Sequence, residues 1–270
     1  AYSQMPKLPF LFYSSQVRNH RKITVIDGKI AYLGGFNIGN EYNNQDPKLS
    51  PWRDYHLKMT GEGVTDLQSE FLEDWRAAAK VNLLQNKAYF PSLEKGTIRQ
   101  QLVPTEGILL EEMMSDLISN AKTSIFIGTP YFIPSKRVFS LLRDAIKRGV
   151  SVTVLVPLVS DHALVKEASY PYLRTLIRDG AEVYQYLNGF YHSKALLVDD
   201  TVCDIGTANF DKRSMFLNYE LNCLIYDVDF IKKIKLILTE DILNSRKAAL
   251  DDFNRSLLKE KAASTISYFL

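Results

Sequence analysis

Two short segments of the chain carry the same chemically active residues at the same spacing. Both read His-x-Lys-x4-Asp, and their members are His20, Lys22, Asp27, His192, Lys194 and Asp199. In each copy a pair of small residues, one spacer and an asparagine follow, which is Asn37 in the first copy and Asn209 in the second. With Lys and Asp each near ~6% of an average chain, two of four histidines match both spacings by chance with odds of roughly one in ten thousand. The repeat therefore indicates a function.

The residues after each motif histidine are aliphatic or β-branched, which is typical of a strand. The period of two in a strand places His and Lys on one face, so both functional groups point into the same space. Two such strands side by side would direct two imidazoles and two ammonium groups into one pocket, with the asparagine amides at its edge. The pattern predicts an anion site that holds a nucleophile and an acid.

The doubled motif resembles that of the phospholipase D superfamily. Further segments narrow the resemblance to bacterial cardiolipin synthases: Arg-Asn-His-Arg-Lys at 18–22, Gly-Gly-Phe-Asn-Ile-Gly-Asn-Glu-Tyr at 34–42, Trp-Arg-Asp at 52–54, Thr-Pro-Tyr-Phe-Ile-Pro at 129–134 and Gly-Thr-Ala-Asn-Phe-Asp at 206–211. The similarity extends from about residue 10 to residue 227. It implies the fold and the chemistry of that family.

Two histidines are the minimum set for this chemistry on a phosphodiester. A neutral imidazole attacks phosphorus and forms a phosphohistidine, while a second, protonated imidazole donates to the departing oxygen. The two motif lysines supply positive charge to the phosphate oxygens, and Asn37 and Asn209 supply amide donors, each typically worth ~2.7–4 kcal/mol in the transition state. Thr207 and the pair Arg213-Ser214 are weaker phosphate-binding candidates. No metal or other cofactor is needed, so we expect activity to survive chelators.

Each imidazole needs a partner on its other ring nitrogen to fix its tautomer. When the two halves are aligned by their asparagines, Asp54 and Glu220 fall at corresponding positions, each at the start of the next strand. These two carboxylates are our candidates for orienting the histidines. The family also places an acidic residue there.

Other polar residues have structural interpretations. Asp27 and Asp199 stand beside turns and are suited to capping them, although the resemblance counts them among the active-site residues. His56 and His162 lack the motif, and a zinc site built from the four histidines has no pair at the short ligand spacing that zinc uses. Tyr131 and Phe190, with their neighbours, are core aromatics or line a lipid entry; the sequence favours neither.

Composition limits the class of protein. The chain has 270 residues, of which 46% are hydrophobic and 24% charged, and its formal net charge is +2. This is a globular composition without the basic excess that attracts nucleic acid, so no nucleic-acid partner is expected. The two cysteines, Cys203 and Cys223, lie in apolar runs and are expected to be buried thiols. No apolar run reaches 18 residues, and the segment at 5–13 is interrupted, so a lipid substrate would be met from the bilayer surface.

Strands alternate with helices along the chain. Strands are predicted at 17–26, 29–33, 54–59, 124–128, 150–157, 181–186, 192–198, 202–206 and 221–226, and helices at 64–80, 107–122, 136–148, 163–178 and 229–244. Asp27-Gly28 is a hairpin turn signal, 40–51 is a loop, and the charged tail at 245–270 is expected to be helical and peripheral.

The predicted fold class is α/β, a phospholipase D-like fold of two pseudo-repeated lobes with mixed β-sheets flanked by helices. Residues 1–90 form the C-terminal part of the first lobe, and residues 91–270 form the second lobe with its tail. Only 19 residues precede His20, whereas three strands and three helices precede His192. We therefore expect the first lobe to be truncated at its N-terminus and the chain to be a fragment.

The resemblance implies a cardiolipin synthase, which transfers a phosphatidyl group between two phosphatidylglycerol molecules through a phosphohistidine and releases glycerol. The expected partners are phosphatidylglycerol, other phospholipids and the membrane surface. The expected location is the bacterial cell membrane, with spanning segments outside the chain given. The motif alone does not choose the acceptor, so a phospholipase D-type lipid hydrolase or nuclease remains an alternative, as does an inactive membrane-surface scaffold.

Overall fold

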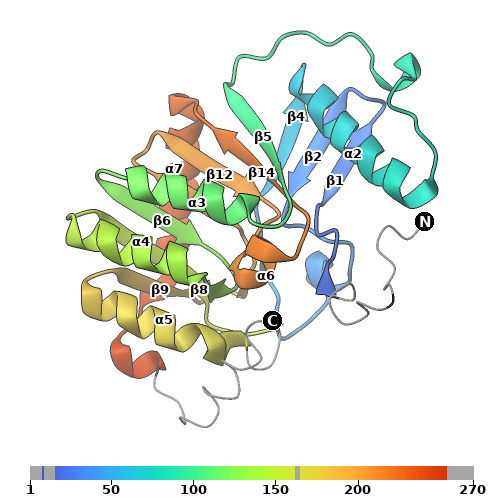
Figure 1. Cartoon of the computed structure of the whole chain (residues 1–270). Helices are drawn as coiled ribbons and strands as arrows, with labels where there is room; N and C mark the ends of the chain where they lie inside the picture. Colours follow the sequence, from blue (N-terminus) through green and yellow to red (C-terminus); the bar gives the residue numbers. More distant parts are fainter. Residues whose placement is uncertain (1–7, 9–15, 162–164, 254–270) are drawn as a thin grey trace.

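The structure, a computed structural model, describes residue 8, residues 16–161 and residues 165–253 (Figure 1). Most of the apolar segment at 5–13, His162 and the tail beyond residue 253 lie outside the described residues, and the predictions made for them stay predictions. Within the described chain, none of the helices is both long and apolar enough to cross a bilayer.

The first lobe is a small antiparallel sheet covered by one helix. Its strands follow the order β1-β2-β4, and α2 packs on them; the bounds are β1 Ile23–Ile26, β2 Ile30–Gly34, β4 His56–Thr60 and α2 Gly63–Ala79. Asp27 and Gly28 turn the chain between β1 and β2 with φ of 53° and 65°. The predicted hairpin is confirmed, because this pair adopts the left-handed conformation that the tightest hairpin turns require.

The second lobe contains an eight-stranded mixed sheet in the order β15-β9-β8-β6-β11-β12-β14-β5. β6, β8 and β9 run parallel to one another, and the remaining neighbours are antiparallel. The strands are β5 Gln100–Thr105, β6 Ser124–Gly128, β8 Ser151–Pro157, β9 Glu182–Tyr186, β11 Ala195–Val198, β12 Val202–Gly206, β14 Glu220–Ile225 and β15 Ser245–Lys247.

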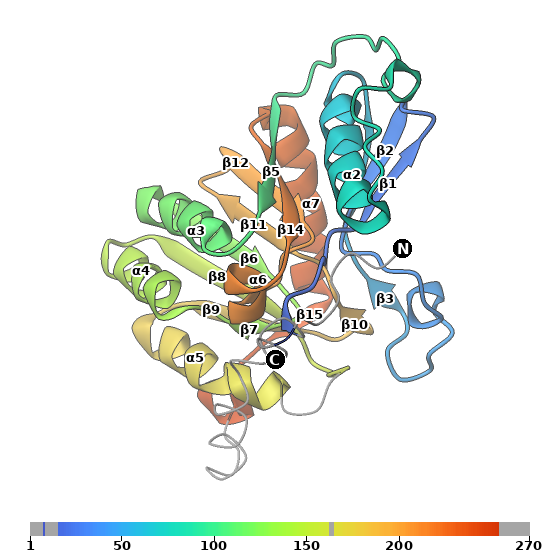
Figure 2. The same ribbon diagram turned by 45° about the vertical axis from the view of Figure 1, so that its right-hand side comes forward.

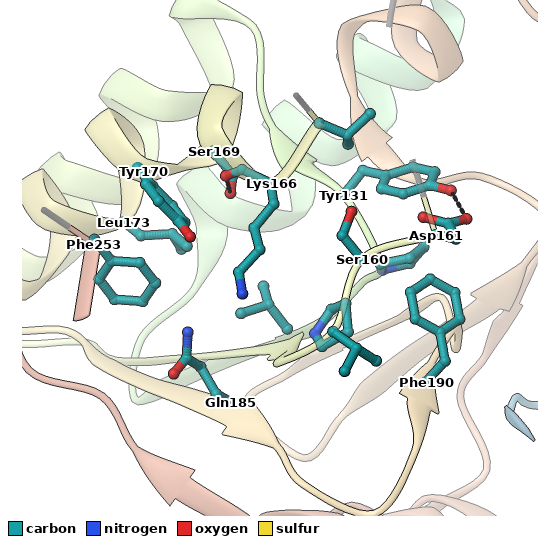
Figure 3. A pocket seen from close by; sticks show the side chains of 15 residues that line it. Tyr131, Ser160, Asp161, Lys166, Ser169, Tyr170, Leu173, Gln185, Phe190 and Phe253 are labelled. Atoms are coloured by element: carbon teal, nitrogen blue, oxygen red, sulfur yellow. Dashed lines mark hydrogen bonds between the residues drawn. The ribbon is translucent and has the colours of Figure 1, made fainter. Parts of the chain in front are cut away.

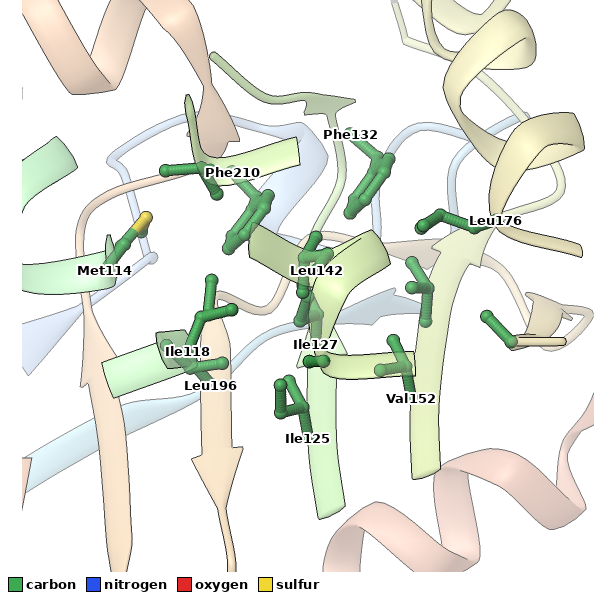
Figure 4. Close-up of a cluster of buried hydrophobic side chains, with 14 of the residues drawn as sticks. Met114, Ile118, Ile125, Ile127, Phe132, Leu142, Val152, Leu176, Leu196 and Phe210 are labelled. Atoms are coloured by element: carbon green, nitrogen blue, oxygen red, sulfur yellow. The ribbon is translucent and has the colours of Figure 1, made fainter. Parts of the chain in front are cut away.

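Helices cover both faces of this sheet. Three of them lie side by side on one face (Figure 1), and α7 lies on the other; they are α3 Leu109–Asn120, α4 Lys136–Lys147, α5 Val165–Asp179 and α7 Val228–Leu243. The main core fills the space between the three helices and the sheet, with side chains that include Met114, Ile118, Ile125, Ile127, Leu142, Val152, Leu176 and Leu196 (Figure 4). Full burial of one such side chain is worth about 1.5–3 kcal/mol.

Short elements connect the layers and bring the loops together. β3 pairs with β10, and β7 pairs with β13, in two small parallel ladders. The bounds are β3 Trp52–Arg53, β7 Phe132–Ile133, β10 Phe190–Tyr191, β13 Phe210–Asp211, α6 Lys212–Phe216 and the 3-10 helices η1 Glu41–Asn43, η2 Lys87–Tyr89 and η3 Leu250–Phe253. The β3–β10 ladder joins the two lobes, since β3 leads into β4 and β10 leads into β11.

The two lobes repeat one arrangement, which confirms the predicted α/β class and its pseudo-repeat. The antiparallel order β1-β2-β4 in the first lobe matches β11-β12-β14 in the second, and α2 and α7 follow at corresponding points. In the second lobe β11 also pairs with β6, whereas no strand among the described residues pairs with the outer edge of β1. The lobe boundary near residue 90 and the truncation of the first lobe stay predictions.

Two edge strands differ from the sequence analysis. β5 was not predicted, because Gln100, Gln101 and Pro104 interrupt its apolar pattern, and it forms a strand because β14 offers it an edge. The tail was expected to be helical and peripheral, but Ser245–Lys247 adds β15 to the other edge of the sheet. Edge strands depend on their partner more than on their own residues, which is why local patterns miss them.

Asp27 and Asp199 lie at hairpin turns, at the ends of β1 and β11 remote from the motif histidines. The four residues of β11 separate Lys194 from Asp199, and these five steps correspond to about 16 Å at ~3.3 Å per residue. Asp199 instead accepts hydrogen bonds from the turn before β6, namely from the backbone N of Lys122, Thr123 and Ser124 at 2.7, 2.7 and 2.9 Å and from Thr123 Oγ1 at 2.9 Å. The contacts of Asp199 and the position of Asp27 between β1 and β2 agree with a turn-forming role, and the catalytic role expected for both aspartates stays a prediction.

Replacing Asp199 by alanine is expected to lower the free energy of unfolding by about 1–3 kcal/mol, because four donors lose their acceptor. Burial raises the pKa of Asp199, but the backbone N–H groups outweigh it and hold the pKa below the ordinary 3.8. A depressed pKa contributes stability above the unfolded-state value and loses it as the pH falls through the folded-state value. Urea unfolding of the original chain and of Asp199→Ala measures the difference between their free energies of unfolding. This difference should be smaller at about pH 3 than at neutral pH.

Asp116→Ala on α3 is the matched control, because Asp116 is exposed and such changes usually alter stability by less than about 0.5 kcal/mol. An Asp199→Ala protein that is as stable as the original chain would contradict the turn-forming role.

Candidate active site

The first motif histidine lies against the carboxylate of Glu220. His20 Nδ1 is 2.9 Å from both carboxylate oxygens of Glu220, so the ring N–H donates to this group. The backbone amide of His20 also donates to the carbonyl of Tyr219 at 2.9 Å. His20 precedes β1 in the first lobe, whereas Glu220 begins β14 in the second. This pair therefore joins the lobes.

The second motif histidine lies against the carboxylate of Asp54. His192 Nδ1 is 2.7 Å from Asp54 Oδ2, and the backbone amide of His192 donates to the carbonyl of Arg53 at 2.7 Å. The imidazole side chain is 7% exposed and the carboxylate 1% exposed. Here the histidine belongs to the second lobe and the carboxylate to the first, so the two pairs are crossed between the lobes.

Glu220 is held by a complete set of hydrogen bonds. Besides His20, its carboxylate accepts from Thr207 Oγ1 at 2.6 Å, Ser214 Oγ at 2.8 Å and Asn218 Nδ2 at 3.2 Å. Burial raises the pKa of Glu220, but the charge and hydrogen bond of His20 and the charge of Lys22 outweigh it, so the pKa is lowered. Glu220 is thus ionised and fixed in place.

This network corrects the role expected for Thr207. Its hydroxyl donates to Glu220 and accepts from the backbone N of Leu221 at 2.9 Å, and the residue has no exposed surface. A hydroxyl used in both directions is not available to a phosphate. Thr207 positions the carboxylate, and Ser214, the other hydroxyl proposed for phosphate binding, does the same.

Both motif lysines fold back onto their histidines. Lys22 Nζ donates to the carbonyl of His20 at 2.7 Å, and Lys194 Nζ donates to the carbonyl of His192 at 2.6 Å. Burial lowers the pKa of Lys22 to about 7. The charge of Lys194 also lowers this pKa, whereas the charge of Glu220 raises it. Burial likewise lowers the pKa of Lys194 to about 8. The charge of Lys194 contributes to the lowered pKa of Lys22, so the two ammonium groups lie near each other.

His192 is neutral at physiological pH. Burial, reinforced by the charge of Lys194 and opposed by Asp54, lowers the pKa of His192 to about 4. Lys194 Nζ lies 2.9 Å from His192 Nδ1 and 3.1 Å from His192 Nε2, and Nδ1 also lies 2.7 Å from Asp54 Oδ2. Because an ionised carboxylate only accepts, Nδ1 carries the proton and donates to Asp54, and the lone pair is on Nε2. The carboxylate thereby fixes the tautomer and leaves the Nε2 lone pair directed at the site. His20 is more open, with 27% of its side chain exposed.

The expectation that two motif strands lie side by side is wrong. β1 and β11 belong to different sheets, and the motif residues precede these strands rather than lie on them. The segments before the strands cross to the other lobe instead, where Asn19 pairs with Tyr219 and β10 pairs with β3. These bridges bring the residues before β1 and β11 against the opposite lobe, and one pocket shared by both histidines stays a prediction.

The two motif asparagines lie at the site with different surroundings. Asn209 is buried, its backbone N donates to Ser214 Oγ at 3.2 Å, and its Oδ1 has no hydrogen-bond partner among the described residues. Asn37 Nδ2 donates to Tyr42 Oη. This unpartnered atom is a carbonyl oxygen, which accepts hydrogen bonds and therefore cannot itself donate to a phosphate oxygen. The phosphate-binding roles of both asparagines stay predictions.

Aromatic rings enclose His192. The ring centroids of Trp52, Tyr42 and Phe190 lie 4.8, 5.9 and 5.8 Å from that of the imidazole. Phe190 also lines a neighbouring cavity, where Tyr131 donates to Asp161 (Figure 3). This cavity has a volume of about 20 Å³, which suits a water molecule and is far too small for an acyl chain. Of the two interpretations left open for these aromatics, burial favours packing for Phe190.

Two residues that shape the site were not assigned this role by the sequence analysis. Ser214 and Asn218 both hold Glu220, and the signal for them is spacing. Asn218 stands two residues before Glu220, and Ser214, in the short α6, stands five residues after Asn209. Asp211 accepts from the backbone N of Ser214 at 2.7 Å and begins that turn. Their contacts depend on a turn geometry that the residue types alone do not specify.

The arrangement combines two carboxylate-held imidazoles with two buried ammonium groups. Such a set can attack a phosphodiester, protonate its leaving oxygen and neutralise its non-bridging oxygens. Among the described residues no group of three or more His, Cys, Asp and Glu side chains could hold a metal ion. Lys22 and Lys194 supply positive charge beside the imidazoles.

Known proteins resemble this chain closely. It is 45% identical to the minor cardiolipin synthase ClsB of Bacillus subtilis over 98% of this chain and 67% of that protein. It is 39% identical to the major cardiolipin synthase ClsA of Bacillus subtilis over 94% of this chain and 54% of that protein. The chain thus spans between about half and two thirds of the length of these relatives.

The fold and the family model agree with these relatives. A solved phosphatidylserine synthase from Haemophilus influenzae superimposes with a TM-score of 0.73 over 95% of this chain and 72% of that one, at 17% identity, and so shares the fold. A family model described as "Cardiolipin synthase, PLD-like domain" matches residues 114–242. Together with the 45% identity to a cardiolipin synthase, this shows that the chain belongs to the cardiolipin synthase family of phospholipase D-like proteins.

Proposed function

We propose that the chain catalyses phosphatidyl transfer between two phosphatidylglycerol molecules, which yields cardiolipin and glycerol. The observation that carries this proposal is the crossed arrangement of the two histidine–carboxylate pairs beside two buried lysines. The names of the relatives support the choice of a lipid acceptor, since both are cardiolipin synthases.

The proposed reaction has two displacements at one phosphorus atom. Nε2 of one motif histidine attacks the phosphorus of phosphatidylglycerol, the bond from phosphorus to the glycerol oxygen breaks, and the other imidazolium protonates that oxygen. A phosphohistidine results. The hydroxyl of a second phosphatidylglycerol then gives its proton to the free imidazole and attacks phosphorus, and the bond to nitrogen breaks.

The remaining site residues act on charge and orientation. Lys22 and Lys194 stabilise the non-bridging oxygens, and the amides of Asn37 and Asn209 donate to them. Asp54 and Glu220 keep Nδ1 of each ring protonated, so that Nε2 faces phosphorus in both steps. Because the lipid substrates reside in a bilayer, we place the reaction at the surface of the bacterial cell membrane.

Incubation of the chain with phosphatidylglycerol in mixed micelles is expected to give cardiolipin and free glycerol in equal amounts, because each transfer releases one headgroup. Thin-layer chromatography with a labelled headgroup measures both products. Formation of phosphatidic acid without cardiolipin would show a lipid hydrolase. Cleavage of an oligonucleotide without lipid turnover would show a nuclease. If neither substrate is turned over, the inactive membrane-surface scaffold is the remaining alternative.

His20→Ala and His192→Ala are each expected to lower the rate of cardiolipin formation by a factor of about 10² to 10⁴ or more, because each removes a group that transfers a proton or bonds to phosphorus. With phosphatidylglycerol labelled at phosphorus, the unaltered chain should retain an acid-labile label, and the double variant should retain none. His56→Gln is the control, since the exposed His56 is outside both motifs and makes ring contacts with Tyr32 and Phe36. Absence of label in an active, unaltered chain would count against the covalent step.

The rate is expected to fall as the pH rises above about 7–8, because the lysines that stabilise the phosphate have pKa values of about 7 and 8 instead of the ordinary 10.5. The charged forms exist below these values and are lost above them. The pH profile of kcat/KM reports this loss in the free protein. Lys22→Arg should move the decline upward, since a guanidinium stays charged. A rate that stays constant to about pH 9.5 would oppose the role given to the lysines.

A further inference from the structure

Asp241, on the last turns of α7, binds the side chains on both sides of Asp54. Its Oδ1 accepts from Arg53 Nε at 2.8 Å, and its Oδ2 accepts from Tyr55 Oη. Asp241 is 1% exposed, so its charge depends on these two partners. α7 lies between the sheet of the second lobe and the first lobe (Figure 2), where it also contacts Tyr55 within an apolar cluster.

Extended backbone explains why this contact reaches the catalytic pair. Between the end of β3 at Arg53 and the start of β4 at His56, the side chains of residues 53 and 55 contact Asp241, whereas that of Asp54 contacts His192, so alternate residues face opposite sides. Anchoring Arg53 and Tyr55 to one carboxylate therefore fixes the direction of Asp54, whose carboxylate accepts from His192 Nδ1 at 2.7 Å. The backbone N of Tyr55 also donates to Asp54 Oδ1 at 2.8 Å.

The anchored segment holds the histidine as well as the carboxylate. The carbonyl of Arg53 accepts the backbone N–H of His192 at 2.7 Å, within the β3–β10 ladder that joins the lobes. A shift of Arg53 would thus displace both members of the pair. We propose that Asp241 is a positioning residue for the Asp54–His192 pair, acting through Arg53 and Tyr55.

The other histidine has a comparable support, which strengthens this inference. Arg21, next to His20, donates from Nε to the carbonyl of Glu220 at 3.1 Å and from its guanidinium to Asp74 on α2 at 3.0 Å. Its side chain is 4% exposed. In both cases a helix carboxylate binds an arginine next to a member of a histidine–carboxylate pair. Asp74 binds Arg21 beside His20, and Asp241 binds Arg53 beside Asp54. The two helices, α2 and α7, occupy corresponding positions in the two lobes.

The proposal rests on the function proposed above and adds a residue that does not touch the substrate. An ion pair with a merely structural role would contribute to stability and leave the ring of His192 in place. A positioning role instead predicts that loss of the Asp241 charge changes the hydrogen bond between His192 and Asp54. The two roles are therefore separated by observing that hydrogen bond directly.

The test uses nuclear magnetic resonance of the chain with ¹⁵N-labelled histidine. The sequence contains four histidines, so His→Gln variants assign the low-field Nδ1 protons of His20 and His192. In Asp241→Asn we expect the resonance of His192 to shift or disappear and that of His20 to stay. We further expect kcat for cardiolipin formation to fall about ten- to hundredfold with KM within about twofold, the usual effect of misplacing a reacting group.

Asp229→Asn is the matched control, because Asp229 lies on the same helix, is 83% exposed and pairs with Lys232. It should alter neither resonance nor the rate. The double variant Arg53→Gln/Asp241→Asn should be no slower than the slower single variant, since both changes remove one interaction.

An unchanged His192 resonance in folded Asp241→Asn would overturn the proposal, as would equal changes at His20 and His192. If Asp241→Asn does not fold, Tyr55→Phe removes one of the two contacts, and the same shift of smaller size is expected; no shift there would also refute the proposal. If the unaltered chain makes no cardiolipin, the proposed function fails, while the resonance of His192 still decides the role of Asp241.

Discussion

The crossed hydrogen bonds between each motif histidine and the carboxylate of the opposite lobe are the interactions on which the site depends. Glu220 has no exposed surface and the Asp54 side chain is 1% exposed. A carboxylate removed from water is stable only when charged or polar partners replace its hydration. Because His20 and His192 supply those partners from the other lobe, neither lobe contains a complete histidine–carboxylate pair. The same bonds that build the reactive centre therefore fix the relative placement of the lobes.

Two ammonium groups in one buried space form the second constraint. Burial lowers the pKa of Lys22 to about 7 and that of Lys194 to about 8, and the charge of Lys194 contributes to the shift of Lys22. Their bonds to the carbonyls of His20 and His192 hold them at the centre without neutralising them. A phosphodiester carries the negative charge that such a site favours, and it meets donors that are already oriented, so little reorganisation accompanies the reaction.

The two halves of the site contain the same kinds of residue but differ in the side chains that hold each carboxylate. Side chains of the second lobe satisfy Glu220 almost completely, through Thr207, Ser214 and Asn218. Asp54 has fewer direct partners and takes its direction from the anchored residues beside it. This difference follows the chain: a short helix, α6, follows the motif of the second lobe, whereas a longer loop with a 3-10 turn occupies that position in the first.

The sequence by itself determined the repeated motif, the α/β class, the family and most helices and central strands, because residue type and local periodicity encode them. It also selected Asp54 and Glu220, since the repeat aligns them. Only the tertiary structure decided which histidine meets which carboxylate, that Thr207 serves Glu220, and that Asp199 forms a turn. His20 and Glu220 stand 200 residues apart, and no local pattern specifies a contact at that separation. Such contacts, like the edge strands β5 and β15, depend on the packing of the whole chain.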